Sequence, residues 1–309
     1  MTPSASDHTI LVNNIIAMLS PNHSWPSPLF DMGYRLLSIE EMFNVGTEGS
    51  NPCNPDIISV ESVKNTVMLL ECKGGKNVDE NQLQNYLSVT PPDIVQLVTV
   101  NDQKIVSIHI VYVARKVSDL KKSINLTLKK IRKNGIIAEV PKDIDIIEST
   151  DQIIRVYTSN ERRWPSTMIN GIQISEGTFP MHYYPFSEDD DGDYILGEVI
   201  RLILHLISNK PSINPDEIVL TTDEVLLDIF DAHSYISNHQ KRKVKRQVDI
   251  CFSKLIKEKS LKGKIYRIST KGKSLSVKKS KEIREDLIKL GMEIQEGFKQ
   301  APLEDFFDL

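Results

Sequence analysis

Two short apolar runs in the first third of the chain give the clearest signal in the pattern of hydrophobic and polar positions. Residues 57–60 read IISV and residues 66–70 read TVMLL, and turn-forming residues bound both runs. Clusters of β-branched and aliphatic residues between such boundaries are typical of buried strands. The short ESVKN segment that separates them predicts that the two strands pair as a hairpin.

The rest of the first half alternates between helical and extended patterns. In some segments the apolar residues recur at three- and four-residue spacing, as on one face of a helix, and other segments are strand-like. The expected helices cover residues 7–19, about 29–43, about 78–89 and about 118–133, and the further strands cover 95–100, 104–114 and 136–140. This order of helices and strands predicts an α/β sandwich.

Beyond residue 150 the pattern changes twice. Residues 150–194 combine one strand-like run, IIRVYT, with many Pro, Gly and aromatic residues, so this part is an elaboration of the sheet or a linker, and we expect surface loops in it. From residue 195 onward the periodicity is helical. We expect domains at 1–150, 151–194 and 195–309, with the last containing helices at about 196–208, 221–230 and 238–259 and short strands at 264–270 and 273–277.

Charge is distributed unevenly along the chain. Residues 195–309 contain 21 Lys and Arg residues against 17 Asp and Glu residues, whereas the preceding part contains 17 against 25. Within 241–281 the ratio reaches 16 against 2. Such asymmetry indicates a polyanionic partner for the C-terminal part, and the alternative is a basic helix face that is merely solvated.

Three helices followed by a basic hairpin resemble a winged helix-turn-helix. In that fold the third helix enters the major groove of DNA and the hairpin touches the backbone. The resemblance implies a mostly helical DNA-binding domain. Its contacts to phosphate would come from Lys241, Arg242, Lys243, Lys245 and Arg246 on the third helix and from Lys271 and Lys273 in the hairpin.

Charged residues lie at the ends of the two buried strands. Asp56 precedes the first strand, and Glu71 and Lys73 end the second. Residues two apart on a strand share a face, so Glu71 and Lys73 project together and Cys72 points the other way. If the strands form a hairpin, Asp56 and Glu71 lie at the same end of the sheet. Two carboxylates held this close need compensation, which Mg²⁺ or Mn²⁺ provides.

These residues carry a resemblance to a known superfamily. Pro55-Asp56, then Glu71-x-Lys73, then Gln82-x-x-x-Tyr86 on a following helix resemble the PD-(D/E)xK nucleases. The Gln-x-x-x-Tyr element is similar to the RecB-like branch, and PDII followed by E-x-K is similar to archaeal Holliday-junction resolvases. The resemblance covers about the first half of the chain and implies a restriction-endonuclease-like α/β sandwich core.

The resemblance also implies a role for each residue of the motif. Asp56, Glu71 and the backbone carbonyl of Cys72 would hold Mg²⁺ or Mn²⁺. Lys73 would orient or deprotonate the attacking water or stabilise the transition state, and Gln82 and Tyr86 would position the water or the DNA backbone.

A further acid is expected from the helix at about 29–43. The first core helix of the superfamily often contributes an acid to the metal site. At 100° per residue Glu40 falls inside the apolar face of this helix, and Glu41, at its edge, is the reserve candidate. The alternative is that both acids are solvated.

The sequence therefore predicts a metal-dependent DNA endonuclease, targeted to DNA by a basic winged helix, in defence, repair or a mobile element. Two alternatives remain open at this stage. One is a non-catalytic DNA-binding or assembly protein on a nuclease scaffold, and the other is a transposase-type end-cleaving subunit that needs a partner. The expected partner is DNA, with a homodimer or a partner protein as further options.

Other classes of protein are excluded by missing patterns. The scattered cysteines, Cys53, Cys72 and Cys251, have neither a disulfide framework nor zinc-site spacing, and the chain has no P-loop or nucleophile-elbow motif. No run has the length of a membrane span, and the N-terminal apolar run lacks the features of a signal peptide. We expect a cytoplasmic protein.

Overall fold

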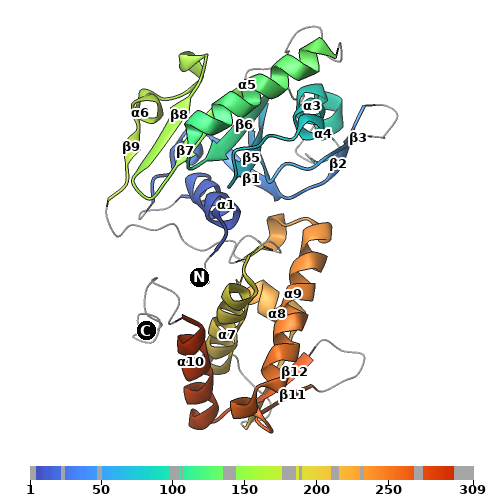
Figure 1. Cartoon of the computed structure of the whole chain (residues 1–309), viewed down its shortest axis with the longest axis vertical. Helices are drawn as coiled ribbons and strands as arrows, with labels where there is room; N and C mark the ends of the chain where they lie inside the picture. Colours follow the sequence, from blue (N-terminus) through green and yellow to red (C-terminus); the bar gives the residue numbers. More distant parts are fainter. Residues whose placement is uncertain are drawn as a thin grey trace. The chain divides into compact units, whose positions relative to one another are not determined.

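The computed structural model describes residues 5–21, 25–46, 51–95, 97, 105, 107–134, 144–175, 186–187, 190–209, 216–229, 233–267 and 274–295. The chain divides into two compact units. The sheet unit comprises Ile10–His182 and Tyr235–Ser237, and the helical unit comprises Met1–Thr9, Tyr183–Ser234 and Asn238–Leu309. Figure 1 shows the elements of both units in the order of the sequence. The predicted α/β class is confirmed at this level.

The sheet unit is built on a mixed sheet of seven strands, ordered β1-β4-β5-β6-β7-β8-β9. The three central strands run parallel to one another, and the outer pairs are antiparallel. The predicted hairpin is confirmed, because β4 pairs antiparallel with β5 through a four-residue turn. The strands are β1 (Tyr34–Ile39), β4 (Ile57–Glu61), β5 (Thr66–Lys73), β6 (Ser107–Ala114), β7 (Ile144–Ser149), β8 (Ile153–Tyr157) and β9 (Ile172–Gln173), and β2 (Phe43–Val45) pairs with β3 (Asn51–Cys53) in a separate ribbon.

Helices cover both faces of this sheet (Figure 1). Apolar residues of α3 and α5 form one core with alternate residues of β4, β5, β6 and β7. On the opposite face, the Asn14 amide of α1 donates to the Ser149 hydroxyl of β7 at 2.9 Å. The helices of this part of the chain are α1 (Asp7–Met18), α2 (Pro28–Asp31), α3 (Glu80–Ser88), α4 (Pro91–Val95), α5 (Val117–Lys133) and α6 (Ser166–Asn170), with the 3₁₀ turn η1 (Glu161–Arg163).

The prediction of a helix at about 29–43 is wrong. The chain forms only the short helix α2 and then, from Tyr34, strand β1. Gly33 separates the two elements with φ of 93°, a left-handed conformation that an α-helix does not tolerate and that glycine adopts without strain. The apolar residues at helical spacing that suggested the helix are divided between these elements.

The segment 150–194, expected to be an elaboration of the sheet or a linker with surface loops, belongs to the sheet unit as far as His182. Strands β8 and β9 extend the seven-stranded sheet. Trp164 is buried, and its indole N–H donates to the Asp145 carboxylate at 2.8 Å. Arg163 reaches the same carboxylate oxygen at 3.0 Å. A surface loop is therefore a wrong description of this part of the segment.

The helical unit combines helices with a three-stranded antiparallel sheet ordered β10-β12-β11. Its core is formed by apolar residues of α7, α8, α9 and α10 together with those of the strands. The elements are α7 (Gly192–Asn209), β10 (Glu217–Thr221), α8 (Thr222–Ile229), η2 (His233–Tyr235), α9 (Asn238–Lys257), η3 (Lys259–Leu261), β11 (Ile265–Arg267), β12 (Ser274–Lys278) and α10 (Lys281–Gln295). The helices and the two short strands predicted after residue 195 are present. Within the described ranges no helix is both long and apolar enough to span a membrane.

Asp190 ties together residues that are far apart in the sequence. Its carboxylate accepts hydrogen bonds from the Ser6 backbone N–H at 2.7 Å and from the Thr9 hydroxyl at 2.8 Å. The Ser187 backbone N–H donates to the same carboxylate at 2.5 Å. This buried acid therefore fixes the start of α1 in the helical unit.

Candidate functional site

The two acids of the sequence motif meet at one end of the sheet. Asp56 lies directly before β4, one residue beyond the registered pair Ile57–Leu70, and so faces Glu71 on β5. The backbone N–H of Cys72 donates to Asp56 Oδ2 at 2.5 Å, which fixes the Asp56 carboxylate at this end of the strands. The hairpin therefore brings the two carboxylates together as the sequence predicts.

Glu71, Lys73 and Gln82 form a closed hydrogen-bonded network. Lys73 Nζ lies 2.6 Å from Glu71 Oε1 and donates to Gln82 Oε1 at 2.9 Å. Gln82 Nε2 in turn donates to Glu71 Oε1 at 2.9 Å. Glu71 and Lys73 share a face of β5 because they are two residues apart, and Gln82 reaches them from the first turn of α3. The amide of Gln82 thus holds the ammonium and the carboxylate in a fixed arrangement.

Tyr86 completes the network from the next turn of α3. Its hydroxyl contacts Glu71 Oε2, and Gln82 Nε2 donates to the Tyr86 hydroxyl at 3.1 Å. Burial, with the nearby Glu71 charge, raises the pKa of Tyr86 well above its ordinary value. The hydroxyl therefore stays protonated and can donate to the carboxylate. Both α3 residues contact the site itself, whereas a role in positioning water or the DNA backbone stays a prediction.

Glu71 is an unusual acid because of its surroundings. Only 3% of its surface is exposed. Burial and, next, the charge of Asp56 raise the pKa of Glu71 to about 7, although Lys73 and the hydrogen bond from Tyr86 act in the opposite direction. A buried carboxylate that is costly to ionise beside a second carboxylate is a common property of functional sites.

Asp56 and Glu71 offer carboxylate oxygens, the kind of ligand that a divalent cation such as Mg²⁺ prefers. Within the parts of the chain that the structure describes, no three His, Cys, Asp or Glu side chains gather closely enough to hold a metal ion. Mg²⁺, however, is often bound by only one or two carboxylates, with water and substrate phosphate as the other ligands. Asp56 and Glu71 fit this requirement, because the Asp56 charge raises the cost of ionising Glu71 and a cation would offset it.

Glu40 lies at the same end of the strands, but on a different element from the expected helix. It follows β1 rather than lying on a helix, and its backbone N–H donates to the carbonyl oxygen of Asp56 at 2.8 Å. Glu40 has a φ of 50°, an uncommon conformation for a residue with a side chain. The ends of β1, β4 and β5 therefore place Glu40, Asp56 and Glu71 on three neighbouring strands. Glu41 follows in the chain and is partly exposed.

Two residues near the site have no counterpart among those predicted from the sequence. Tyr112 lies beside Glu71 in the parallel register of β5 and β6, is fully buried, and its hydroxyl has no hydrogen-bond partner among the described residues. Asp79 is the N-cap of α3 and accepts a hydrogen bond from the Gln82 backbone N–H at 2.8 Å. The cap is readable from the sequence as an acid before a helix, but the register that places Tyr112 joins strands distant in the chain.

Removing the Asp79 cap is expected to loosen the helix that carries Gln82 and Tyr86. Asp79→Ala should lower the free energy of unfolding by about 1 kcal/mol, because the first turn of α3 loses a hydrogen-bond acceptor. The melting temperature should fall by about 2–4 °C. Calorimetry of Asp79→Asn provides the matched control, since asparagine also caps helices. Equal melting temperatures for the alanine variant and the natural protein would contradict the assigned cap.

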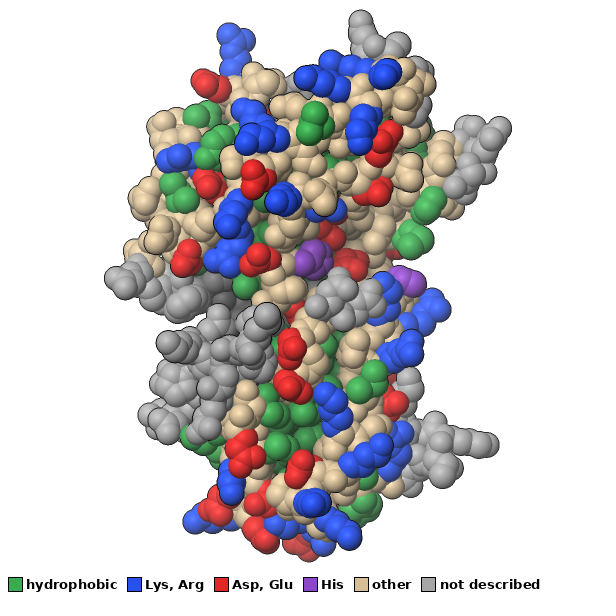
Figure 2. Space-filling view, viewed as in Figure 1, with side chains coloured by type: hydrophobic (Ala, Val, Ile, Leu, Met, Phe, Trp, Pro, Cys, Tyr) green, Lys and Arg blue, Asp and Glu red, His purple; other side chains and the backbone are tan. Residues whose placement is uncertain are grey.

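The second group of predicted residues lies on α9 of the helical unit. Arg242 and Arg246 are exposed, and Lys241, Lys243 and Lys245 are partly exposed. Lys245 forms an ion pair with Asp223 of α8. Figure 2 shows Lys and Arg side chains along the side of this unit where α9 lies. Lys271 and Lys273, the predicted hairpin contacts, lie outside the described residues.

Comparison with known proteins identifies the family. The MJECL32 domain model matches residues 7–184, which is more than half of the chain. The chain therefore belongs to the MJECL32 domain family. The uncharacterized protein MJECL32 of Methanocaldococcus jannaschii is 32% identical over 93 residues, a match that covers 27% of this chain and 21% of that protein. The matched part is thus about a fifth of the relative's length. No solved structure matched the chain significantly.

Proposed function

We propose that this member of the MJECL32 domain family is a metal-dependent nuclease that hydrolyses phosphodiester bonds in DNA. The observation that carries the proposal is the convergence of Asp56, Glu71 and Lys73 at one end of β4 and β5, with Gln82 of α3 bound to the last two. An ion pair between a partly exposed lysine and a buried carboxylate, beside a second carboxylate, is costly to maintain for structure alone. It suits a reaction in which negative charge develops on a phosphate.

In this proposal each side chain has a distinct task. Asp56 and Glu71 would hold Mg²⁺ or Mn²⁺, which would lower the pKa of a bound water and offset charge on the phosphate. Lys73 would direct its ammonium toward the developing charge, since Glu71 and Gln82 already fix its position. Gln82 and Tyr86 would keep the Glu71 carboxylate in one orientation.

The helical unit supports a second part of the proposal. Its elements follow the order helix, strand, helix, helix and two strands, and β12 lies between β10 and β11. This order resembles that of a winged helix, whose third helix enters the major groove. We assign that role to α9, whose first half carries the sequence KRKVKR.

The cleavage of DNA by the purified full chain tests the catalytic proposal. Supercoiled, linear and branched DNA would each be incubated with Mg²⁺, with Mn²⁺ and with EDTA. Nicking or cutting that needs the metal is the expected result, and the preferred DNA form would identify the substrate. Absence of cleavage on all three forms under all metal conditions would contradict an autonomous nuclease.

Charge removal on α9 is expected to weaken duplex binding. Arg242→Ala/Arg246→Ala should reduce affinity about tenfold or more and lower the slope of log K against log salt by about 1.8, because each lost phosphate contact accounts for about 0.9. Anisotropy titrations with a labelled duplex in EDTA would measure both. The control Lys281→Ala/Lys289→Ala removes two cations from α10 that are also exposed. Unchanged binding by the arginine variant would exclude α9 as the DNA-contacting helix.

A non-catalytic DNA-binding protein on the same scaffold is the second candidate. The observation in its favour is that the Glu71 carboxylate already has partners for both oxygens within the chain, namely Lys73, Gln82 and Tyr86. Such a network can hold β5 and α3 together without a metal ion. Duplex binding that depends on α9, with no metal-dependent cleavage, would favour this candidate.

A further inference from the structure

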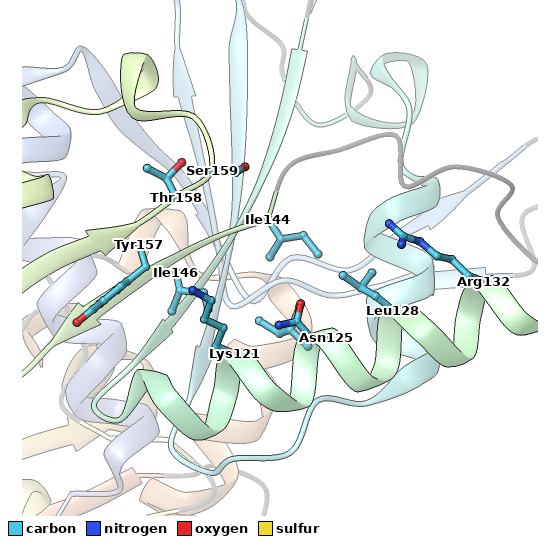
Figure 3. A pocket seen from close by; sticks show the side chains of 10 residues that line it. Lys121, Asn125, Leu128, Arg132, Ile144, Ile146, Tyr157, Thr158 and Ser159 are labelled. Atoms are coloured by element: carbon cyan, nitrogen blue, oxygen red, sulfur yellow. The ribbon is translucent and has the colours of Figure 1, made fainter.

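A pocket lies on the face of the sheet that α5 covers, and none of the motif residues line it. It has a volume of about 530 Å³ and lies between α5, the start of β7 and the end of β8. Figure 3 shows side chains of α5 facing the strand ends across it. Its floor is aliphatic and its rim is polar. The floor is formed by Ile124, Leu128, Ile144 and Ile146, and the rim by Lys121, Asn125, Arg132, Tyr157, Thr158 and Ser159.

The pocket lies across the sheet from the acids rather than among them. In the strand register Glu71 of β5 pairs with Tyr112 of β6, Tyr112 pairs with Ile146 of β7, and Ile146 pairs with Tyr157 of β8. Strand β6 therefore separates the acids from the pocket, and the lining of the pocket includes none of the motif residues.

Helix α5 is strongly basic along its whole length. It carries six Lys and Arg residues and one acid, Asp119. None of the six cations forms an ion pair with any residue in the described parts of the chain. Two other acids bind neutral groups at or near this helix and pocket: Glu80 accepts from the Asn134 amide, and Glu148 accepts from the Tyr157 hydroxyl at 2.8 Å. The positive charge of the helix is thus largely uncompensated.

The cations of α5 fall into two groups by direction. At about 100° per residue, Lys121, Asn125, Leu128 and Arg132 lie within an arc of about 60°, and this arc faces the pocket. Lys122 and Lys130 project about 100° and 180° away from Lys121. Along the axis, Lys121 and Arg132 are separated by about 16 Å, because each residue advances the helix by about 1.5 Å.

We propose that this pocket binds single-stranded nucleic acid. Two cations about 16 Å apart match a chain of phosphates, whereas a small anion needs only one cluster of charge. The aliphatic floor and the Tyr157 ring offer a surface for an unstacked base, and the hydroxyl and amide groups of the rim can bond to its edges. A duplex keeps its bases stacked inside and cannot use such a floor. The volume also lies in the range of about 300–1,000 Å³ that is usual for individual small ligands.

The inference rests on the proposed function only in its choice of nucleic acid as the ligand. It would mean that the protein acts on DNA with a single-stranded part, such as a flap, an overhang or a displaced strand. The strand would pass along α5, with phosphates at Lys121 and Arg132. A base would lie against Tyr157, whose ring is held in place by the hydrogen bond to Glu148.

Binding of a labelled 20-residue oligothymidylate to the full chain in EDTA tests the inference without any need for cleavage. Lys121→Ala/Arg132→Ala should weaken this binding about 10- to 30-fold near 0.1 M salt. The slope of log K against log salt should fall by about 1.4, since each phosphate contact of a single strand accounts for about 0.7. Lys122→Ala/Lys130→Ala is the matched control, because it removes the same charge from the same helix away from the pocket. We expect a loss of less than about threefold for this control.

A second readout separates this pocket from the basic surface of α9. Photo-crosslinking of the same oligonucleotide carrying 4-thiothymidine should modify peptides that contain Tyr157, Thr158 or Ser159. All variants should keep the melting temperature of the natural protein, because the replaced side chains are exposed. Equal weakening by the two double variants, crosslinks confined to residues of α9, or no binding of the single strand at low salt would each overturn the inference.

Single-strand binding at the pocket and nuclease activity can be tested independently of each other. Pocket-dependent binding of the single strand by a protein that cleaves nothing would retain the inference and contradict the nuclease. Metal-dependent cleavage by a protein whose pocket variants bind single strands normally would retain the nuclease and overturn the inference. A duplex of equal length that displaces the strand from the pocket and crosslinks to Tyr157 would also overturn it.

Discussion

Lys73→Ala is expected to reduce metal-dependent DNA cleavage by about 10²–10⁴-fold, the range found when a positioned proton-transfer or charge-stabilising group is removed. The ammonium lies 2.6 Å from Glu71 and 2.9 Å from Gln82, with only 19% of the side chain exposed. No neighbouring cation among the described contacts of Glu71 can replace it. Initial rates of nicking of a supercoiled plasmid in Mg²⁺ would measure the loss.

A nearby lysine supplies the control for this experiment. Lys76 lies three residues further along the chain and is exposed in the segment that leads to α3. Lys76→Ala changes the net charge by the same amount and should leave the rate within about twofold of the natural protein. DNA affinity in EDTA should be equal for both variants, because the proposed role of Lys73 is in the chemical step. Full cleavage by Lys73→Ala would exclude Lys73 from catalysis and favour the non-catalytic scaffold.

Glu71→Gln is expected to abolish cleavage and, at the same time, to stabilise the metal-free protein above pH 7. Burial and the Asp56 charge raise the pKa of Glu71 from its ordinary value of 4.5 to about 7 in the folded chain. The folded state therefore binds the proton more tightly than the unfolded state. The contribution of Glu71 to stability is fully present below about pH 4.5 and is lost as the pH rises to about 7.

Glutamine resembles the protonated acid and cannot ionise, so the variant avoids this loss. Near pH 4.5 the two proteins should melt at similar temperatures, and at pH 8 the variant should be more stable by on the order of 2 kcal/mol. That difference corresponds to a rise of roughly 4–8 °C in melting temperature. Calorimetry at several pH values would measure it, with Glu161→Gln, an exposed acid, as control. A pH-independent difference between Glu71→Gln and the natural protein would contradict the raised pKa of Glu71.

The same two proteins report on metal binding. Mg²⁺ should raise the melting temperature of the natural protein at pH 8, because a cation bound between Asp56 and Glu71 favours the ionised carboxylates and binds only the folded chain. Glu71→Gln should show little or no rise. A similar rise in both proteins would place the cation elsewhere.

Individual helices and hairpins could be predicted where the local pattern of apolar and polar residues determines them. The β4–β5 hairpin follows from two apolar runs and a short turn, and α5 and α9 follow from apolar residues at helical spacing. Strand order was not predictable, because the parallel pairing of β5 with β6 and of β6 with β7 depends on packing between distant segments. The sequence predicts a helix where β1 forms, because the apolar residues there fit a helical period by coincidence and Gly33, with its positive φ, ends the helical segment.

The candidate site shows the same division between local and distant information. The motif residues span only Asp56 to Tyr86, and the structure brings together all five that the sequence singled out. Glu40 was proposed on the wrong element, yet the pairing of β1 with β4 places it at the same edge. Tyr112 was missed because its place beside Glu71 comes from the register of β6. Tertiary pairing thus determined the residues that local pattern could not supply.

The hydrogen bonds of Asp190 impose an order of events on the newly made chain. Its partners Thr9 and Ser6 lie 181 and 184 positions earlier. At a synthesis rate of about 5–20 residues per second, the first turn of α1 waits roughly 10–40 s for this partner after it has left the ribosome. The remainder of α1 can pack on the sheet as soon as β7 has emerged. The first turn of α1 is therefore secured only after all seven strands of the sheet have been synthesised.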